Sequence, residues 1–369
     1  MIYLDYASNH PVRKEVLDEF VKVESTYEGN CNSIHGLGRE SLAFFHEIDD
    51  RMYHLLNLDK EEYEVIYTSS ASESNNMVIK GLFESYTGYS TNFLSSPFEH
   101  SSVNAALAYL KDKGADVLLL SSDSKGKLDL SDLKEKLKNR PILTCVSMVE
   151  SETGAIQDVH TIQKIVSEAG GYLLVDATQA LGKIPFALDG LDFVSFGPHK
   201  FGGILGTGVL VKKRDIVLTP LIHGGKSLSI YRSSSPALGL IASTIKATEL
   251  ALKDEKENYD YVKSLSSFLV SELEKNPHVL INSFLENPFV VNISYRGEKA
   301  FDVVSYLDRN GICVSQKSAC SITNTPSKVI NSIYHDKKRA SSSFRISLSA
   351  LTTKEELMTF LKILGEYHK

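Results

Sequence analysis

The sequence predicts an α/β fold, in which helices cover a mainly parallel sheet. Between residues 63 and 210, short runs of leucine and β-branched residues alternate with segments that carry apolar residues at helical spacing. This alternation is typical of parallel sheets covered by helices. The chain has 369 residues, more than one hydrophobic core normally holds, so we also expect a smaller second domain.

The first two-thirds of the chain predict seven strands and four helices. The strands are expected where leucine and β-branched residues follow one another: 64–67, 92–94, 117–120, 142–147, 172–175, 193–196 and 208–211. The helices are expected where apolar residues recur at helical spacing and Asp, Ser or Thr stands near the start: 74–84, 101–113, 129–138 and 161–169.

The pattern changes after Pro236, where a long helical stretch runs to about residue 275. We place the domain boundary within this stretch, so that 13–252 form a large domain and 1–12 with 253–369 form a small one. Further elements are expected in the small domain: strands 289–294, 312–314 and 344–347, a helix at 299–310 and a terminal amphipathic helix. The serine-rich segments 315–327 and 340–343 are expected to be loops.

Charge and composition exclude several classes of function. The net charge of −6 and the scattering of lysines among acids disfavour direct binding of nucleic acid. No apolar run approaches membrane-spanning length and no signal-peptide pattern opens the chain, so we expect a soluble, cytoplasmic protein without membrane contact. Four cysteines without a CxxC pair argue against a disulfide framework and a zinc site.

Two segments near the middle of the chain carry the strongest chemical signal. Asp176 ends an apolar run, and Lys200 follows His199 at the start of a glycine-rich turn. Either residue alone has an ordinary interpretation, as a turn acid or a solvated surface lysine. Together they suit pyridoxal 5'-phosphate, whose chemistry needs an amine to bind the aldehyde and a carboxylate to keep the ring nitrogen protonated.

Three further features fit the same cofactor. The hydroxyl-rich segment 68–74 leads from a strand into a helix, where free N–H groups and the helix dipole favour a phosphate, although Ser70 or Ser72 could simply cap the helix. Gln179 could donate to the phenolate oxygen of the ring. His100 could stack on the ring or move protons, or it could be a capping residue.

Two residues far downstream indicate the substrate. Arg345 is a charge in an apolar strand, and its planar fork matches a carboxylate, although a salt bridge at a strand edge is an equal alternative. Cys320 lies in a polar segment flanked by lysines, a setting that keeps a thiolate accessible, although an incidental loop cysteine is an equal alternative. Cys145 and Cys313 lie in apolar runs and are expected to be core residues.

Taken together, these segments resemble the cysteine desulfurases, the class V branch of the fold-type I pyridoxal-phosphate enzymes, over nearly the whole chain. The matching pieces are Tyr3–Ala7 with Pro11, Gly29-Asn30, Asn32-Ser33 with His35, Thr68–Ser74 with Asn76, Glu99-His100, Glu152–Gly154, Ile156–Asp158, Val175–Gln179, His199-Lys200, His223–Gly225, Arg232-Ser233, Ser318–Cys320 and Arg345–Leu348. The segment from Ser318 to Arg345 is similar to that of the long-loop group.

The resemblance implies a role for each cofactor contact. Lys200 would bind the cofactor covalently, Asp176 would contact the ring nitrogen, Gln179 the phenolate oxygen, and His100 would stack on the ring. Ala71, Ser72 and His199 would hold the phosphate, joined by Ser235 from a second subunit, which implies a homodimer.

The resemblance also implies the reaction. Arg345 would bind the carboxylate of L-cysteine, Lys200 would move its α-proton, and Cys320 would take the sulfur as a persulfide, leaving L-alanine. An acceptor protein would then receive the sulfur for iron–sulfur cluster assembly, tRNA thiolation or cofactor synthesis.

The chain departs from the family pattern near the cofactor. Gly197 replaces a serine, Ser70 replaces a glycine, and Glu150-Ser151 replaces Asn-Asn, so that Ser151 stands where an asparagine contacts the ring oxygen or the substrate. Two alternatives therefore stay open: a selenocysteine lyase or other class V enzyme that needs no thiol at Cys320, and a weakly active paralogue that mainly serves as a sulfur-transfer partner.

Overall fold

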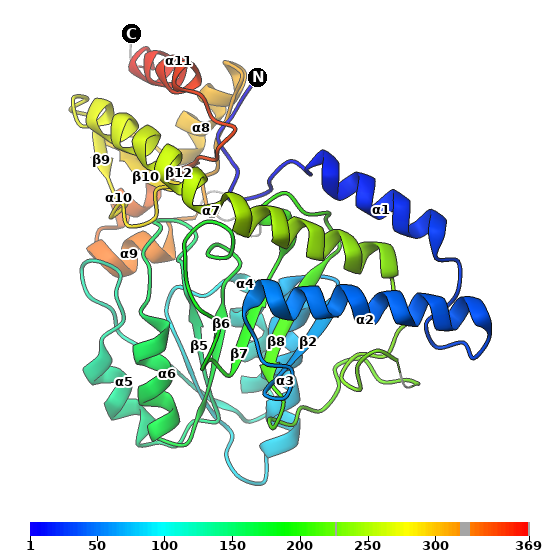
Figure 1. Ribbon diagram of the computed structural model, residues 1–369. Coiled ribbons are helices and arrows are strands. Elements are labelled where there is room, and N and C mark those ends of the chain that lie inside the picture. Colours follow the sequence, from blue (N-terminus) through cyan, green and yellow to red (C-terminus); the bar gives the residue numbers. More distant parts are fainter. Residues whose placement is uncertain (226, 318–324, 368–369) are drawn as a thin grey trace.

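The computed structural model describes residues 1–225, 227–317 and 325–367, which form a large lobe around one sheet and a smaller lobe that holds both chain ends (Figure 1). The sheet of the large lobe has the spatial order β2 (Tyr63–Thr68), β8 (Gly208–Lys213), β7 (Phe193–Phe196), β6 (Tyr172–Asp176), β5 (Leu143–Ser147), β3 (Asn92–Ser95) and β4 (Asp116–Leu119). Strand β8 runs antiparallel to both of its neighbours, β2 and β7, and the other adjacent pairs of this sheet are parallel. The predicted mainly parallel sheet is confirmed.

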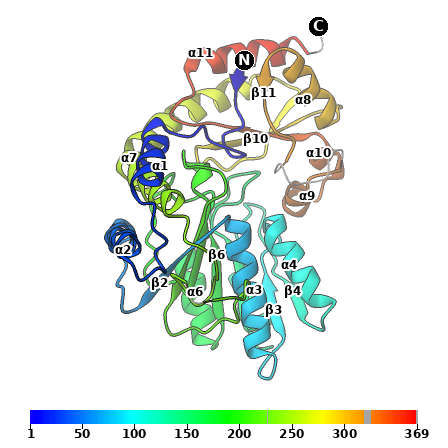
Figure 2. The ribbon, with the colours of Figure 1, turned by 90° about the vertical axis from the view of Figure 1, so that its right-hand side faces the viewer.

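Helices cover both faces of this sheet (Figure 2). On one face, α3 (Ala71–Tyr86) and α4 (Ser101–Lys111) share a buried apolar cluster with alternate residues of the strands. On the other face, α2 (Gly36–Leu56), α6 (Val159–Glu168) and the first half of α7 (Leu238–Leu273) share a second cluster. Alternating strand residues therefore pack into two different cores, which explains the continuously apolar strand runs. Two shorter helices flank these layers, α1 (Lys14–Thr26) along α7 and α5 (Leu130–Leu137) beside α6.

Two helices of the large lobe were not expected from the sequence. The first, α1, has no side-chain cap, and α2 is capped by the ring nitrogen of His35 rather than by Ser, Thr, Asp or Asn. The usual start signal is therefore missing from both. The helix expected at 74–84 in fact begins at Ala71, because the Ser70 hydroxyl accepts from the Glu73 N–H and caps it there.

The smaller lobe is built on an antiparallel sheet of β12 (Ser343–Ser347), β10 (Val290–Tyr295) and β9 (Val279–Ile281). The second half of α7, α8 (Ala300–Arg309) and α11 (Lys354–Gly365) pack on it around a separate apolar core. Near the chain start, β1 (Ile2–Tyr3) pairs in parallel with β11 (Ile312–Cys313). This pairing fixes the N-terminal segment to the smaller lobe, beside the carboxyl ends of the large sheet.

The expectation of a loop at 340–343 is wrong. A short helix, α10 (Lys337–Ser341), begins where the Asp336 carboxylate accepts from two backbone N–H groups, and β12 begins at Ser343. Ahead of it, α9 (Lys328–Tyr334) is capped by Ser327. Ser327 therefore caps a helix and also bonds to Glu152 of the large lobe, which a loop serine would not be expected to do. Of the segment 315–327, the part 318–324, with Cys320, lies outside the described residues.

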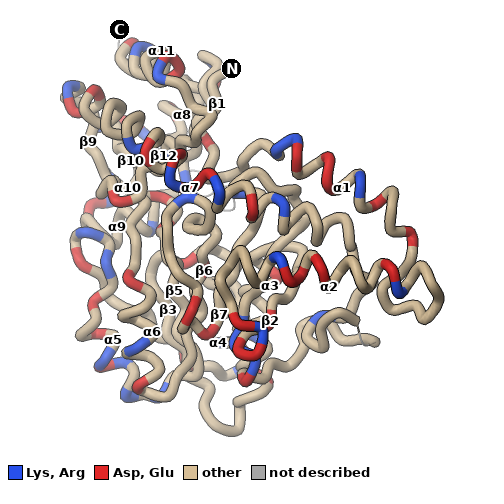
Figure 3. Tube along the Cα trace, in the orientation of Figure 1, with Lys and Arg blue, Asp and Glu red and all other residues tan. Residues whose placement is uncertain are grey.

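Charged residues of both signs are interspersed over the helices (Figure 3). Among the residues that the structure describes, no helix combines the length and apolar character needed to cross a membrane.

Candidate active site

A cavity of about 230 Å³ lies at the carboxyl ends of the parallel strands, between the large sheet and the N-terminal segment. Ligands of open α/β sheets bind at this edge. Nine residues singled out from the sequence line it: Ala71, Ser72, His100, Ser151, Asp176, Gln179, His199, Lys200 and Arg345. Ser235 lies exposed in a loop and does not line the cavity, and Cys320 is outside the described residues.

Asp176 is the last residue of β6, and both of its carboxylate oxygens are fixed. One oxygen accepts from the Asn75 side chain at 3.0 Å, and the other accepts from the Thr178 backbone N–H at 3.0 Å. Asn75 is itself held, since it accepts from the Ser195 hydroxyl at 2.6 Å. The carboxylate therefore has a fixed orientation at the buried wall of the cavity, as a contact with a protonated ring nitrogen requires.

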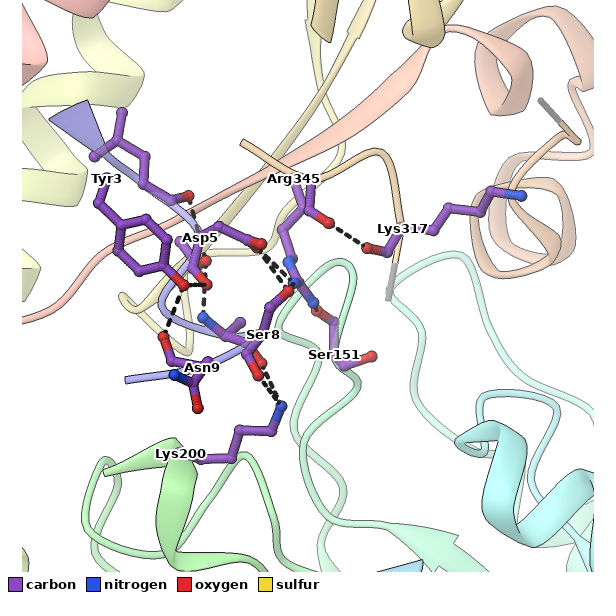
Figure 4. Close-up of polar contacts among 12 residues, drawn as sticks. Tyr3, Asp5, Ser8, Asn9, Ser151, Lys200, Lys317 and Arg345 are labelled. Atoms are coloured by element: carbon purple, nitrogen blue, oxygen red, sulfur yellow. Dashed lines mark hydrogen bonds and ion pairs between the residues drawn. The ribbon is translucent and has the colours of Figure 1, made fainter. Parts of the chain in front are cut away.

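Lys200 ends a short 3-10 turn, Pro198–Lys200, that follows β7. Its Nζ donates to the carbonyl oxygens of Ala7 at 2.9 Å and Ser8 at 2.6 Å (Figure 4). The N-terminal segment thus lies over the amine, which points into the same cavity as Asp176. Neutral carbonyl oxygens therefore hold the amine inside the cavity, in reach of a ligand that binds there.

The two histidines of the cavity favour their neutral forms. Burial, followed by the charges of Lys200 and Lys183, lowers the pKa of His199 to about 4. Burial also lowers the pKa of His100, which caps α4 by accepting from the Ser102 N–H at 3.2 Å. His100 therefore combines the capping and cavity-lining roles that the sequence left as alternatives.

The ring of His199 occupies the space that a side chain at position 197 would need. A Cβ placed on Gly197 would lie 2.9 Å from the His199 ring. Glycine at this position therefore gives the His199 ring room beside the cavity.

The N-terminus of α3 forms one end of the cavity, through Ala71 and Ser72. Glu73 in the first turn would repel an anion, but its carboxylate pairs with Arg232 at 2.5 Å. Burial raises the pKa of Glu73, but the hydrogen bonds that its carboxylate accepts from Arg232 and Ser69 lower it by more, so the net pKa is lowered. The negative charge is thereby neutralised, and the helix N-terminus keeps its preference for a phosphate.

Arg345, on β12, faces the cavity from the smaller lobe and is only 1% exposed. Its fork donates to the Ser151 carbonyl at 2.9 Å, to Asp5 at 3.0 Å and to the Ser8 hydroxyl at 2.8 Å (Figure 4). Its Nε is buried and has no hydrogen-bond partner among the described residues. The guanidinium thus forms a salt bridge, one of the two alternatives left open by the sequence, and also lines the cavity, where its positive charge suits a substrate carboxylate.

Two buried acids lie on either side of Ser151. The Glu150 carboxylate accepts from the backbone N–H groups of Glu152 and Thr153, and Glu152 accepts from the Ser327 hydroxyl at 2.5 Å. Burial and the charge of Glu150 raise the pKa of Glu152 to about 7. This turn thereby connects the cavity wall to the start of α9, and the contact of Ser151 with Arg345 is made by its backbone.

Several residues of the site were not identified from the sequence: Asp5, Ser8, Asn75, Thr178 and Lys183. Asn75 follows Ala71 by four residues, and Lys183 follows Gln179 by four, so helical spacing from the predicted contacts could have suggested both. The contacts of Asp5 and Ser8 join residues more than 330 positions apart, which no local pattern indicates.

The cavity fits pyridoxal 5'-phosphate by its donor set. It combines a fixed carboxylate, a lysine amine and a helix N-terminus. It also contains the buried Thr178 hydroxyl, which has no hydrogen-bond partner among the described residues.

The family model described as Aminotransferase class-V matches residues 2–360. A protein named cysteine desulfurase IscS from Dictyoglomus turgidum is 32% identical over 98% of this chain and 93% of its own length. A putative cysteine desulfurase IscS 1 from Bacillus subtilis is 28% identical over 100% of this chain and 98% of its own. Among solved structures, a NifS-like protein superposes with a TM-score of 0.91 at 29% identity, covering 99% of this chain and 98% of that one. A NifS-like protein from Rickettsia africae gives 0.89 at 27%, covering 100% and 99%.

Proposed function

This chain belongs to the aminotransferase class-V family, and we propose that it is a cysteine desulfurase that uses pyridoxal 5'-phosphate to convert L-cysteine to L-alanine. The observation that carries the proposal is the convergence of Asp176, Lys200 and Arg345 on one cavity. The first two suit the cofactor and the third suits a carboxylate, which together select an amino acid as substrate.

The cofactor would be held at three places. Ala71, Ser72 and His199 would bind its phosphate at the start of α3, Asp176 would bind the ring nitrogen, and Lys200 would bind the aldehyde carbon. Bound in this way, the cofactor supplies an electron sink for negative charge that develops at the substrate α-carbon. Gln179, His100 and Ser151 would complete the ring contacts.

The remaining steps fall to residues of the chain. Arg345 would hold the carboxylate of cysteine with its fork, and its salt bridge to Asp5 keeps the guanidinium in place. Lys200, once its amine is released, would remove the α-proton and return a proton to the product. Its contacts with the Ala7 and Ser8 carbonyls show that the amine reaches this part of the cavity.

Cys320 would act as the sulfur acceptor. Its thiolate would attack the sulfur of the substrate, so that an S–S bond forms and the Cβ–S bond breaks. The bonding electron pair stays with Cβ, which takes up a proton and becomes the methyl group of alanine. The net change is cysteine and a thiol to alanine and a persulfide, with no external oxidant.

The proposal extends to assembly and context. We propose a homodimer in which the exposed Ser235 serves the site of the second subunit, and a protein acceptor for the persulfide, in iron–sulfur cluster assembly or tRNA thiolation. We also propose that the enzyme works in the cytoplasm. Residues 13–252 would act as the cofactor domain, and 1–12 with 253–369 as the domain that carries Arg345 and Cys320.

The proposal is tested by incubating the purified protein, reconstituted with pyridoxal 5'-phosphate, with L-cysteine and a reductant. We expect alanine and sulfide in equal amounts, measured by chromatography and by a colorimetric sulfide assay. Alanine should also form from L-selenocysteine if the selenium lyase alternative holds, with little turnover of cysteine. A protein that shows no visible cofactor absorbance after reconstitution would support the weakly active paralogue instead.

Replacement of Arg345 by lysine should raise the KM for cysteine by about 10- to 100-fold and change kcat less. The lysine keeps the charge but loses the planar fork, so it cannot contact Asp5, Ser8 and a substrate carboxylate together. Steady-state kinetics on reconstituted protein measure both constants. Arg339→Lys is the control, because Arg339 is also held by several contacts of the smaller lobe but does not line the cavity. An unchanged KM in Arg345→Lys would remove Arg345 from substrate binding.

A further inference from the structure

Lys183 is a buried lysine behind the candidate active site. It is 7% exposed, and its Nζ donates to the side-chain oxygen of Gln179 at 2.7 Å. It also lines a second cavity, of about 350 Å³, whose wall includes Lys200. Lys183 does not line the first cavity, so Gln179 stands between its ammonium and the proposed cofactor site.

The contact with Lys183 fixes which way the Gln179 amide points. The amide oxygen accepts from Lys183, and the amide nitrogen donates to the Ala7 carbonyl at 2.8 Å. The Ala7 carbonyl only accepts hydrogen bonds, so a flipped amide would place acceptor against acceptor there, whereas the amine of Lys183 can donate to the amide oxygen in either protonation state. The amide oxygen is thus occupied on the side away from the first cavity, and the atom left to serve a ligand is a donor nitrogen.

We propose that Lys183 is a positioning residue, which holds Gln179 as a hydrogen-bond donor toward the anionic ring oxygen of the cofactor. The role rests on the proposed function, because it needs a ligand with such an oxygen in the cavity. Ala7 links the arrangement to the amine, since its carbonyl accepts from both Gln179 and Lys200.

Positive groups around Lys183 disfavour its charged form. The titratable groups near it are Lys200, Arg345, His10 and His199. The second cavity is also lined by Glu15 and by Arg13, and Arg13 forms an ion pair with Asp254. Burial, followed by Lys200 and Arg345, lowers the pKa of Lys183 from 10.5 to about 7.

The lowered pKa sets the sign of the stability effect. As the pH falls from 10.5 to about 7, the unfolded chain binds a proton at this lysine and the folded chain does not, so the folded state loses stability over that range. Below pH 7 the loss stays constant. At neutral pH this loss offsets part of what the hydrogen bond from Lys183 to Gln179 contributes, so the melting temperature of the cofactor-free protein should change little when Lys183 becomes methionine.

The experiment compares wild type with Lys183→Met, Gln179→Ala and the double variant. Two quantities are measured: the Kd for pyridoxal 5'-phosphate, and the pH midpoint of the visible absorbance of the bound cofactor. We expect Lys183→Met and Gln179→Ala each to weaken binding by about 10- to 150-fold, the size of one hydrogen bond to a charged group. The midpoint should rise in Lys183→Met, because a nearby positive charge is lost. In the double variant, the second substitution should add less than about twofold to Kd.

Lys212→Met is the matched control, because Lys212 is also a fully buried lysine with a lowered pKa and lies outside both cavities. It contacts Glu64 at 3.6 Å and the Tyr231 ring, and its loss should leave the Kd and the midpoint unchanged. Full additivity in the double variant, an unchanged Kd in Lys183→Met, or an equal effect in Lys212→Met would each overturn the role of Lys183. Wild-type protein that binds no pyridoxal 5'-phosphate would instead overturn the proposed function, and this role with it.

Discussion

Lys200→Ala should lower alanine formation from cysteine by at least about 10³- to 10⁴-fold, because one amine both binds the cofactor and moves the substrate proton. The cofactor should still enter the cavity, since Asp176 and the N-terminus of α3 remain. Without the covalent bond, however, it should be lost on dialysis, whereas wild-type protein keeps it. Alanine release is measured by chromatography, and cofactor retention by absorbance before and after dialysis.

The variant should fold, because Lys200 is partly exposed and water can replace its Nζ as the donor to the carbonyls of Ala7 and Ser8. The melting temperature should therefore fall by only a few degrees. A small primary amine added to the solution should restore part of the activity, since it can take the proton in place of the lost side chain. Activity within about tenfold of wild type would rule out Lys200 as the reacting amine.

The sequence predicts the large sheet well because its strands are buried on both faces. Such strands are continuously apolar, and the helices between them begin at side-chain caps such as Asp129 and Asp158. Prediction failed for α1 and α2, where no side chain of the usual capping types marks the start. The prediction of a loop at 340–343 was also wrong. Its serines are typical of loops, but Ser341 ends a helix and Ser343 begins a buried strand.

The site residues that could be predicted are those that stand at or just after the end of a predicted strand. Asp176, Gln179 and His199-Lys200 follow strands whose ends must meet at one edge of a parallel sheet, so their convergence follows from the fold. Asp5 and Ser8 were missed because their contacts with Arg345 depend on the pairing of β1 with β11. Lys183 was missed because a lysine is usually solvated, and only the packing of the folded chain shows that this one is buried.

Cys320→Ala should abolish sulfur transfer and lower alanine formation by at least about 10²-fold, because the thiolate is the group that removes sulfur from the substrate. The position of its neighbours supports this role. Lys317 donates to Thr325 at 2.6 Å, and Ser327 donates to Glu152, whose neighbour Ser151 lines the cavity.

The measurement is mass spectrometry of the protein after one turnover, with thiols alkylated. Wild type should carry one additional sulfur on the peptide that contains Cys320, and Cys320→Ala should carry none on any peptide. Cys313→Ala is the matched control, since Cys313 is a partly buried thiol on β11 that does not line the cavity, and it should retain activity within about twofold. Undiminished alanine formation in Cys320→Ala would contradict the persulfide mechanism and favour a selenocysteine lyase or another class V reaction, in which Lys200 and Arg345 suffice and the thiol has no part.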